Sequence, residues 1–219
     1  MIQVEKISKS YLDVDKEVVV FKDLSFQIEA GKTVALMGQS GAGKSTLLHL
    51  LGGFDVVDGG EILVDDQRIT GMNDAELSVF RRLHLGMIFQ QFNLIPSLKA
   101  RDNISFVRRL NGLPAEDDFT QQLVEVMGLT RRLAHYPRQL SIGEQQRVAI
   151  ARALAAKPKF ILADEPTGNL DEETAAHVME LLIKAVELDD VTLLLVTHSQ
   201  ATADYLQTTW RLEKGRLHC

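Results

Sequence analysis

Apolar and polar residues alternate near the N-terminus of the chain. Ile2 and Val4 alternate with polar neighbours, and two further apolar stretches, residues 18–21 and 24–28, follow around polar breaks. A period of two is typical of strands that bury one face and expose the other. The pattern therefore predicts an antiparallel sheet in this part of the chain.

Short apolar runs and helical periods then follow one another. Residues 33–37, 160–163 and 191–196 are runs of aliphatic or β-branched side chains, which suit buried parallel strands. Apolar positions with a helical period predict helices over residues 44–51, 74–83 and 148–156. Residues 61–64 and 67–69 are expected to pair as a hairpin around Asp65 and Asp66. The order of elements predicts an α/β domain with a parallel core sheet.

A mainly helical stretch interrupts this order between residues 91 and 140, with breaks at residues 110–114 and 135–137. We interpret it as an inserted helical subdomain, residues 90–145, within one domain that spans residues 1–219. The core of that domain would comprise residues 1–89 and 146–219.

The composition agrees with one globular domain and argues against several other classes of protein. The chain has 219 residues, of which 45% are apolar and 25% charged, as in ordinary folded domains. No apolar run approaches the roughly 20 residues of a membrane-spanning helix, and no secretory signal is recognisable, so we expect a cytoplasmic protein. The single cysteine, Cys219, leaves no intrachain disulfide and no cysteine cluster for zinc. A net charge of -6 argues against a dedicated nucleic-acid binder.

Residues 38–45 fit the pattern G-x-x-x-x-G-K-[ST] and lie between a predicted strand and a predicted helix. Glycines let backbone N–H groups approach phosphate oxygens, and the helix N-terminus adds positive potential. Lys44 would reach the β- and γ-phosphates, and the Ser45 hydroxyl would bind Mg²⁺. The residues expected to contact phosphate are Gly38, Ser40, Gly41, Ala42, Gly43, Lys44, Ser45 and Thr46. Taken alone, this loop would suit a GTPase, a kinase or a motor equally well.

Two carboxylates, Asp164 and Glu165, directly follow a predicted buried strand. In open α/β sheets ligands bind outside the carboxyl ends of the strands, which is where the phosphate loop lies. Asp164 would then hold Mg²⁺, and Glu165 would orient or deprotonate the attacking water. His198 follows another strand in the same way and is a candidate partner for the γ-phosphate or Glu165. The alternative is a purely structural role, in which both carboxylates cap the turn of residues 166–169.

Residues 140–147 read Leu-Ser-Ile-Gly-Glu-Gln-Gln-Arg and precede a predicted helix, with Ser141 at the N-cap position. On its own this is a well-capped helix. Together with the phosphate loop and the acidic pair, it resembles the signature of the ATP-binding-cassette (ABC) ATPases, usually Leu-Ser-Gly-Gly followed by Gln or Glu. The resemblance covers essentially the whole chain and implies a P-loop NTPase fold that binds and hydrolyses ATP.

Further residues match this family in its order along the chain. Tyr11 resembles the aromatic residue that stacks on adenine, Gln90 the Q-loop glutamine, residues 169–171 the D-loop, and His198 the switch histidine. The resemblance implies a catalytic role for Gln90 and His198 beside Glu165, and a magnesium site of Ser45, Gln90 and Asp164. It adds to the ATP contacts Tyr11, Ser141, Gly143 and Asp171.

Residues 89–96 and 163–171 narrow the resemblance to the lipoprotein-releasing, macrolide-exporting and cell-division branch of the family. In that branch the ATPase serves a membrane protein with few spanning helices. Two positions depart from the pattern: Ile142 stands where the family has Gly, and Ser199 where the branch commonly has Asp.

Phosphoryl transfer needs positive groups around the γ-phosphate, and no arginine of the chain is obviously placed to supply them. The resemblance implies that residues 141–143 of a second copy do so, in a head-to-tail dimer around two ATP molecules. It also implies an integral membrane permease as partner, and hence a peripheral position on the cytoplasmic face of the inner or plasma membrane. Residues 90–96 would transmit the motion, with Phe92 and Leu94 in an exposed apolar docking surface.

Other interpretations remain open at the level of the sequence. Ile142 motivates a weakly hydrolysing cassette that acts as an ATP-dependent regulatory clamp. A soluble cassette acting on DNA or ribosomes would usually carry paired cassettes, a coiled coil or zinc modules, none of which is seen in this sequence. An adenylate-kinase-like enzyme would use the phosphate loop but not the signature. Cargo and transport direction are not encoded in any of these motifs.

Overall fold

The computed structural model describes residues 1–14 and 16–218. Cys219, on which the expectation about disulfides and zinc rests, lies outside the described residues. Within the described part of the chain no helix is long and apolar enough to cross a membrane.

An antiparallel sheet forms the N-terminal part of the fold, as the alternating pattern predicts. Its strands lie in the order β2-β1-β4-β5. They are β1 (Ile2–Asp13), β2 (Lys16–Ile28), β4 (Gly59–Val64) and β5 (Gln67–Arg68). Ile2, Val4 and Ile7 of β1 are buried beneath the sheet. The apolar stretches 18–21 and 24–28 belong to one continuous strand, β2, whose pairing with β1 shifts register several times.

A second sheet forms the centre of the molecule, with strand order β10-β9-β3-β8-β7-β6. The predicted strands are β3 (Thr33–Met37), β7 (Phe160–Asp164) and β8 (Thr192–Val196). Three further strands were not predicted from the sequence: β6 (Leu85–Ile88), β9 (Thr208–Glu213) and β10 (Arg216–His218). All neighbouring strands pair in parallel except β9 and β10, which form an antiparallel edge hairpin.

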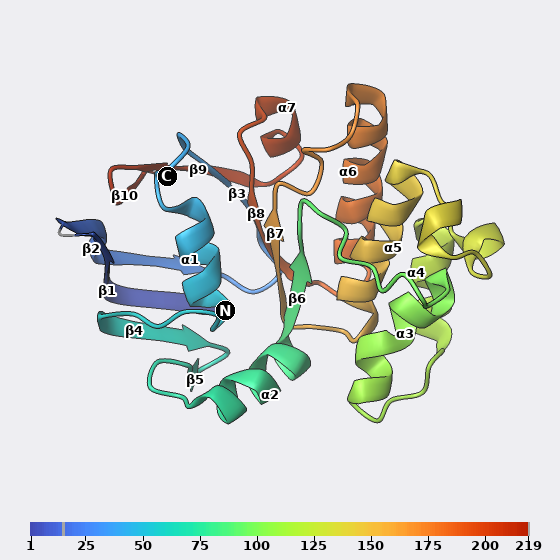
Figure 1. The fold of residues 1–219 in the computed structure, drawn as a ribbon, viewed down its shortest axis with the longest axis horizontal. Helices are drawn as coiled ribbons and strands as arrows, with labels where there is room; N and C mark the ends of the chain where they lie inside the picture. Colours follow the sequence, from blue (N-terminus) through green and yellow to red (C-terminus); the bar gives the residue numbers. More distant parts are fainter. Residues whose placement is uncertain (15, 219) are drawn as a thin grey trace.

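Helices cover both faces of this central sheet (Figure 1). They are α1 (Lys44–Leu51), α2 (Asp74–His84), α3 (Ala100–Leu110), α4 (Asp118–Val126), α5 (Ile142–Ala155), α6 (Glu172–Glu187) and α7 (Gln200–Ala203), with two 3-10 turns, η1 (Thr130–Arg132) and η2 (Pro137–Gln139). Figure 1 shows α1 between the two sheets, and α5 and α6 on the opposite face of the central sheet.

Two apolar cores result, one on each face of the central sheet. Along β7, Phe160 and Leu162 join the core that contains α1 and the antiparallel sheet. Ile161 and Ala163 join the larger core, formed with α3, α4, α5 and α6. Because successive strand residues point to opposite faces and both faces are covered, the strand reads as an uninterrupted apolar run.

The helices α3 and α4 lie between β6 and β7 in the sequence and pack on α5. This agrees with the helical character predicted for residues 91–140. The division into a core of residues 1–89 and 146–219 and an inserted subdomain of residues 90–145 stays a prediction.

Candidate functional site

The carboxyl ends of four parallel strands meet at one edge of the central sheet. Ala163 of β7 lies beside Leu195 of β8 and Ile88 of β6, and Leu36 of β3 lies beside Val196. The segments that leave these strands therefore begin close together. They carry the phosphate loop, the acidic pair, the histidine and the Q-loop glutamine, which is the convergence expected for a ligand site in an open α/β sheet.

The phosphate loop is shaped for close approach of an anion to the backbone. Gly43 is the N-cap of α1 with φ 99°, and no side chain caps the helix or adds an acidic group to its first turn. The N–H groups of that turn are thus left for a ligand. A Cβ on Gly38 would lie 2.5 Å from the carbonyl oxygen of Leu212, so only glycine fits there. Lys44 Nζ lies across the loop and donates to the carbonyls of Gly38, at 2.8 Å, and Gln39, at 3.0 Å.

Asp164 faces the start of α1. Its Oδ2 accepts a hydrogen bond of 3.4 Å from the Ser45 hydroxyl. Burial raises the pKa of Asp164 above its usual value, and the neighbouring charge of Glu165 raises it further. A hydroxyl and a carboxylate in contact, with a carboxylate destabilised by burial, are oxygen donors that fit Mg²⁺. The described residues hold no group of three or more histidine, cysteine or acidic side chains that could bind a metal ion, so such an ion would complete its coordination with other oxygens, including those of water and phosphate.

Glu165 and His198 form a pair at the same edge. The His198 Nδ1 lies 2.7 Å from the Glu165 carboxylate. Because an ionised carboxylate can only accept, Nδ1 donates this bond. The Glu165 backbone has φ 48°, an uncommon conformation for a residue with a side chain. The carboxylates of Asp164 and Glu165 thus contact Ser45 and His198, which disfavours the alternative that they only cap the following turn.

These side chains surround one cavity of about 510 Å³. It is lined by Tyr11, Val20, Gly38, Ser40, Gly41, Gly43, Lys44, Ser45, Thr46, Gln90, Asp164, Glu165, Val196 and His198. Of the predicted phosphate-loop residues, Ala42 lines a neighbouring hollow instead, together with the β9–β10 turn.

Ser141, Gly143 and Asp171 do not line this cavity. Ser141 caps α5 through the Glu144 N–H, and Asp171 caps α6 through the Thr174 N–H at 3.0 Å. A Cβ on Gly143 would lie 2.7 Å from Thr174 Cγ2, so the two helix N-termini pack closely. These three residues therefore form a second cluster, away from the phosphate loop of their own chain.

The two departures from the family pattern are both accommodated. Ser199 caps the short helix α7 by accepting a hydrogen bond from the Thr202 N–H, at 3.3 Å, which an aspartate could also do. Ile142 begins α5 with 55% of its surface exposed.

Sequence reasoning missed several residues around the cavity. Val20 and Val196 line it from β2 and from the end of β8. Asp55 and Lys9 contact Tyr11 at its far end. The two valines lie in ordinary strand patterns, and Asp55 lies outside every motif, so nothing in the sequence distinguishes them.

Phe92 and Leu94, which were expected in an exposed docking surface, are only partly exposed in the structure. Phe92 is half-buried, and Leu94 packs against the larger core. A groove of about 540 Å³ lies nearby, with aromatic side chains from three separate segments of the chain, Phe54, Phe89 and Phe106. The docking role of these two residues stays a prediction, and Arg152 donates to the carbonyls of Phe92 and Asn93, which fixes the backbone of that segment.

Comparison with known proteins gives concordant matches. Residues 21–168 match the ABC transporter family model. The chain is 41% identical over 220 residues to the lipoprotein-releasing system ATP-binding protein LolD of Idiomarina loihiensis, covering 100% of this chain and 96% of the relative. It is also 41% identical over 219 residues to LolD of Xanthomonas campestris pv. campestris, covering 99% of this chain and 92% of the relative.

Solved structures with the same fold include the dimeric structure of MJ0796, a bacterial ABC transporter cassette. It superimposes with a TM-score of 0.87 at 37% identity and covers 100% of this chain and 97% of that one. A dimeric post-hydrolysis state of the same cassette, bound to ADP and Pi, matches with a TM-score of 0.87 at 36% identity.

Proposed function

The chain belongs to the ABC transporter family and is the ATP-binding, ATP-hydrolysing subunit of a transporter, and from this premise we infer that the cavity at the carboxyl edge of its central sheet is the ATP site. The observation that carries this assignment is the convergence of Lys44, Ser45, Asp164, Glu165 and His198 on one cavity. These groups come from three segments of the chain, at residues 44–45, 164–165 and 198, that lie far apart in the sequence.

In this proposal the triphosphate lies along the phosphate loop. The free N–H groups at the start of α1 donate to its oxygens, and Lys44 exchanges its two carbonyl contacts for the β- and γ-phosphates. Ser45, Asp164 and Gln90 would hold Mg²⁺, which when bound supplies positive charge to the phosphate oxygens. The adenine would lie against Tyr11, at the end of the cavity formed by the antiparallel sheet.

Glu165 is the proposed general base. Its carboxylate orients the attacking water and accepts its proton as the water oxygen approaches the γ-phosphorus. His198 donates through Nδ1 to that carboxylate, so it keeps the carboxylate directed at the cavity. Gln90, from the end of β6, would help to place the water. No covalent intermediate on the protein is needed, because positioning and electrostatic stabilisation suffice for phosphoryl transfer.

We further propose that the site is completed by a second copy of the chain. Ser141, Gly143 and the D-loop residue Asp171 form a cluster that does not line the cavity of their own chain. In a head-to-tail dimer this cluster would face the γ-phosphate of the partner subunit. The likeness to two dimeric cassette structures, one of them holding ADP and Pi, supports this arrangement.

The partner that uses the hydrolysis energy is proposed to be an integral membrane protein on whose cytoplasmic face the chain docks. Relatives at 41% identity are named as ATP-binding proteins of a lipoprotein-releasing system. We therefore infer a transporter of that class, with lipid-modified proteins as cargo. The docking site would be the groove lined by Phe54, Phe89 and Phe106, which combines apolar area with three arginines, Arg81, Arg82 and Arg152. A short helix of the membrane protein with an apolar face and acidic flanks would be complementary to it.

Replacing Glu165 tests the site and the dimer together. Glu165→Gln should bind ATP, hydrolyse it at a rate lower by about two orders of magnitude or more, and accumulate as a dimer, because the water loses its base while the phosphate contacts persist. Size-exclusion chromatography with ATP and Mg²⁺ measures the dimer, and phosphate release measures the rate. Lys44→Ala is the matched control and should lose nucleotide affinity and the dimer. A hydrolysis rate like that of the natural chain, or no dimer at any ATP concentration, would contradict the assignment.

A further inference from the structure

Tyr11 is held in place by a carboxylate from a distant part of the chain. It lies near the end of β1 with 40% of its surface exposed, and it lines the candidate ATP cavity. Its phenol donates a hydrogen bond of 2.6 Å to Oδ2 of Asp55. A tyrosine exposed to this degree near the end of a strand would otherwise be free to change its rotamer.

Asp55 is itself fixed by a nearly buried lysine. Lys9 Nζ donates to Asp55 Oδ1 at 2.9 Å and to the Val56 carbonyl at 2.8 Å, and only 7% of the lysine side chain is exposed. The Val56 N–H donates to the same carboxylate oxygen, at 2.7 Å. The two oxygens of Asp55 therefore have separate roles, since Oδ1 anchors the carboxylate and Oδ2 receives the phenol.

Lys9 also restricts the ring directly. Its Nζ lies over the Tyr11 ring, 4.8 Å from the centroid, in a cation–π contact. Lys9 and Tyr11 are two apart on β1 and so project from the same face of the strand. With one ring face approached by the lysine and the hydroxyl bound by Asp55, a planar ligand can reach only the remaining face.

The ionisation states agree with this arrangement. Burial raises the pKa of Tyr11, and the hydrogen bond to Asp55 raises it further, so the phenol keeps its proton. Burial alone would raise the pKa of Asp55, but the hydrogen bonds from Tyr11, Lys9 and the Val56 N–H outweigh it and lower that pKa. The pair is thus a neutral donor on a charged acceptor, which is a strong type of hydrogen bond.

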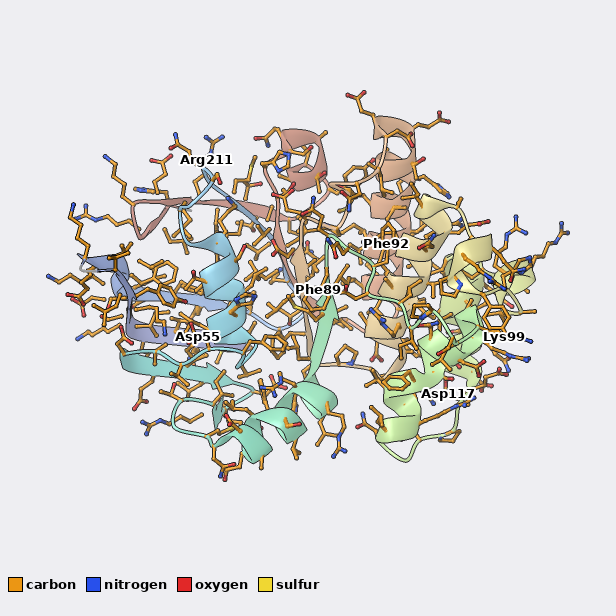
Figure 2. The ribbon with its side chains drawn as sticks, in the orientation of Figure 1. Asp55, Phe89, Phe92, Lys99, Asp117 and Arg211 are labelled. Carbon is orange, nitrogen blue, oxygen red and sulfur yellow. The ribbon has the colours of Figure 1, made fainter. Side chains whose placement is uncertain are left out.

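The position of Asp55 links the ring to the phosphate loop. Asp55 lies shortly after α1, whose N-terminus carries Lys44 and Ser45, and Figure 2 shows it beside that helix. Tyr11 belongs to the antiparallel sheet. The hydrogen bond therefore fixes the distance between an aromatic surface on one sheet and the helix that would hold the phosphates.

We propose that Asp55, supported by Lys9, is a positioning residue that orders the Tyr11 ring as a platform for the nucleotide base. This inference rests on the proposed ATP site. Ordering the ring before ATP arrives removes the entropy that would be lost on binding, since each immobilised side chain otherwise weakens affinity by about three- to tenfold. Asp55 thus acts on ATP through Tyr11 and not by contact with the base.

The sharpest test removes the phenol alone. Tyr11→Phe keeps the ring and leaves the Lys9–Asp55 ion pair intact. We expect its Kd for β,γ-imido-ATP to rise about three- to tenfold. Its Kd for inorganic tripolyphosphate, which has no base, should stay within about twofold of that of the natural chain. Isothermal titration calorimetry measures both, and a merely structural defect at the phosphate loop would weaken both.

A second variant removes the acceptor of the same hydrogen bond together with the lysine that supports it. Lys9→Met with Asp55→Ala removes both charges, so no buried lysine is left unpaired. It should weaken binding of the analogue to a similar extent, and adding Tyr11→Phe should weaken it little further, because the same interaction is already absent. Asp58→Asn is the control: that carboxylate accepts from the Ser10 N–H and hydroxyl but does not contact Tyr11. It should leave the Kd unchanged.

Tyr11→Ala distinguishes failure of this inference from failure of the proposed site. If Tyr11→Ala binds β,γ-imido-ATP as tightly as the natural chain does, the base does not lie on Tyr11. The placement of the adenine against Tyr11 and this inference are then both overturned. If Tyr11→Ala weakens binding but neither Tyr11→Phe nor the double variant does, the platform stands and the positioning role of Asp55 is overturned. Equal weakening of analogue and tripolyphosphate by Tyr11→Phe would also overturn it.

Discussion

Two neighbouring residues at the start of α5 have opposite requirements for space. Gly143 faces α6, where an added Cβ would lie 2.7 Å from Thr174 Cγ2. Ile142 faces outward and has 55% of its surface exposed. An isoleucine in place of the family's glycine is therefore neutral for packing within the chain, and a helical backbone at this position suits it at modest cost. Its bulk matters only to whatever approaches this helix end.

For residue 142 we predict that Ile142→Gly raises ATP turnover several-fold or tightens ATP-driven dimerisation. In the proposed dimer the added bulk separates the signature from the partner subunit's triphosphate and lengthens a hydrogen bond to it. Losing such a donor outright costs about 10²- to 10³-fold in rate, so partial loss costs less. Steady-state phosphate release measures the rate, and size exclusion of the same change combined with Glu165→Gln measures the dimer.

Ile142→Leu keeps the bulk and is the control; it should behave like the natural chain. If Ile142→Gly changes neither turnover nor dimerisation, the side chain does not face the nucleotide and the steric argument is wrong. If the natural chain hydrolyses no ATP even with its membrane partner, the regulatory-clamp interpretation replaces the motor interpretation.

Among the elements, the helices α3, α4 and α5 are joined by one buried arginine. Arg108, near the end of α3, has a side chain only 3% exposed. Its guanidinium donates to the Pro114 carbonyl, the Ala155 carbonyl and Asp117 Oδ2, each at 2.8 Å. Because Asp117 also caps α4 and Ala155 ends α5, this single side chain fixes three helix ends relative to one another.

Removing that guanidinium should destabilise the fold. Arg108→Met keeps much of the apolar stem but leaves two carbonyls without a donor, so we expect a loss of about 2 to 4 kcal/mol in the free energy of unfolding. For a domain of this size that lowers Tm by roughly 5 to 15 °C, which a thermal melt measures.

Arg109 offers a matched control on the same helix. Its ion pair with Asp102 spans 3.2 Å, but 57% of its side chain is exposed. Arg109→Met should therefore cost less than about 0.5 kcal/mol. Equal Tm values for Arg108→Met and Arg109→Met would show that the buried network does not stabilise these helix ends.

The elements also show what a sequence can predict. The helix at residues 44–51 and the strand at 33–37 appear as predicted, because apolar period and glycine breaks agree there. β6 was not predicted because it follows α2 directly: Leu85 is both the C-cap of that helix and the first residue of the strand. No glycine or proline separates the two elements. The strands β9 and β10 are short, and in β9 only Trp210 and Leu212 are buried, so the apolar period extends over too few residues to be recognised.

In the candidate site, too, groups that are contiguous in the sequence were predicted, whereas contacts between distant residues were not. The phosphate loop and the acidic pair are contiguous in sequence and surround the cavity as expected. The contact between Tyr11 and Asp55 joins residues 44 positions apart and depends on a tertiary fold that no local pattern encodes. Likewise, the docking surface was expected within one short segment, whereas the groove takes its aromatic side chains from three separate segments.

Across the whole molecule, the proposed ATP cavity and the groove are joined by adjacent residues of one segment. Gln90 lines the cavity, and Phe89, labelled in Figure 2, lines the groove. Asn169, in the D-loop region, donates to the Gln90 carbonyl at 2.9 Å. We therefore expect a change at the γ-phosphate that moves Gln90 to move Phe89 in the wall of the groove as well, which gives the proposed transmission a physical route.

The last prediction concerns that groove as the docking site for the membrane protein. Phe106 lies in its wall on α3, is 37% exposed, and takes no part in the proposed ATP site. Phe106→Glu should reduce co-purification with the membrane protein by about tenfold or more, because a charge replaces an apolar anchor beside the segment that would be bound. Phosphate release by the isolated chain should stay within about twofold of the natural rate, since the substitution lies outside the ATP site.

Leu188→Glu is the matched control, since Leu188 is 39% exposed at the end of α6 and does not line the groove. It should retain both co-purification and the stimulation of hydrolysis by the membrane protein, whereas Phe106→Glu should lose both. A Tm lower for Phe106→Glu than for Leu188→Glu would show that Phe106 stabilises the helical part of the chain. Undiminished co-purification of Phe106→Glu, at an unchanged Tm, would place the docking surface elsewhere and leave the groove without the function proposed for it.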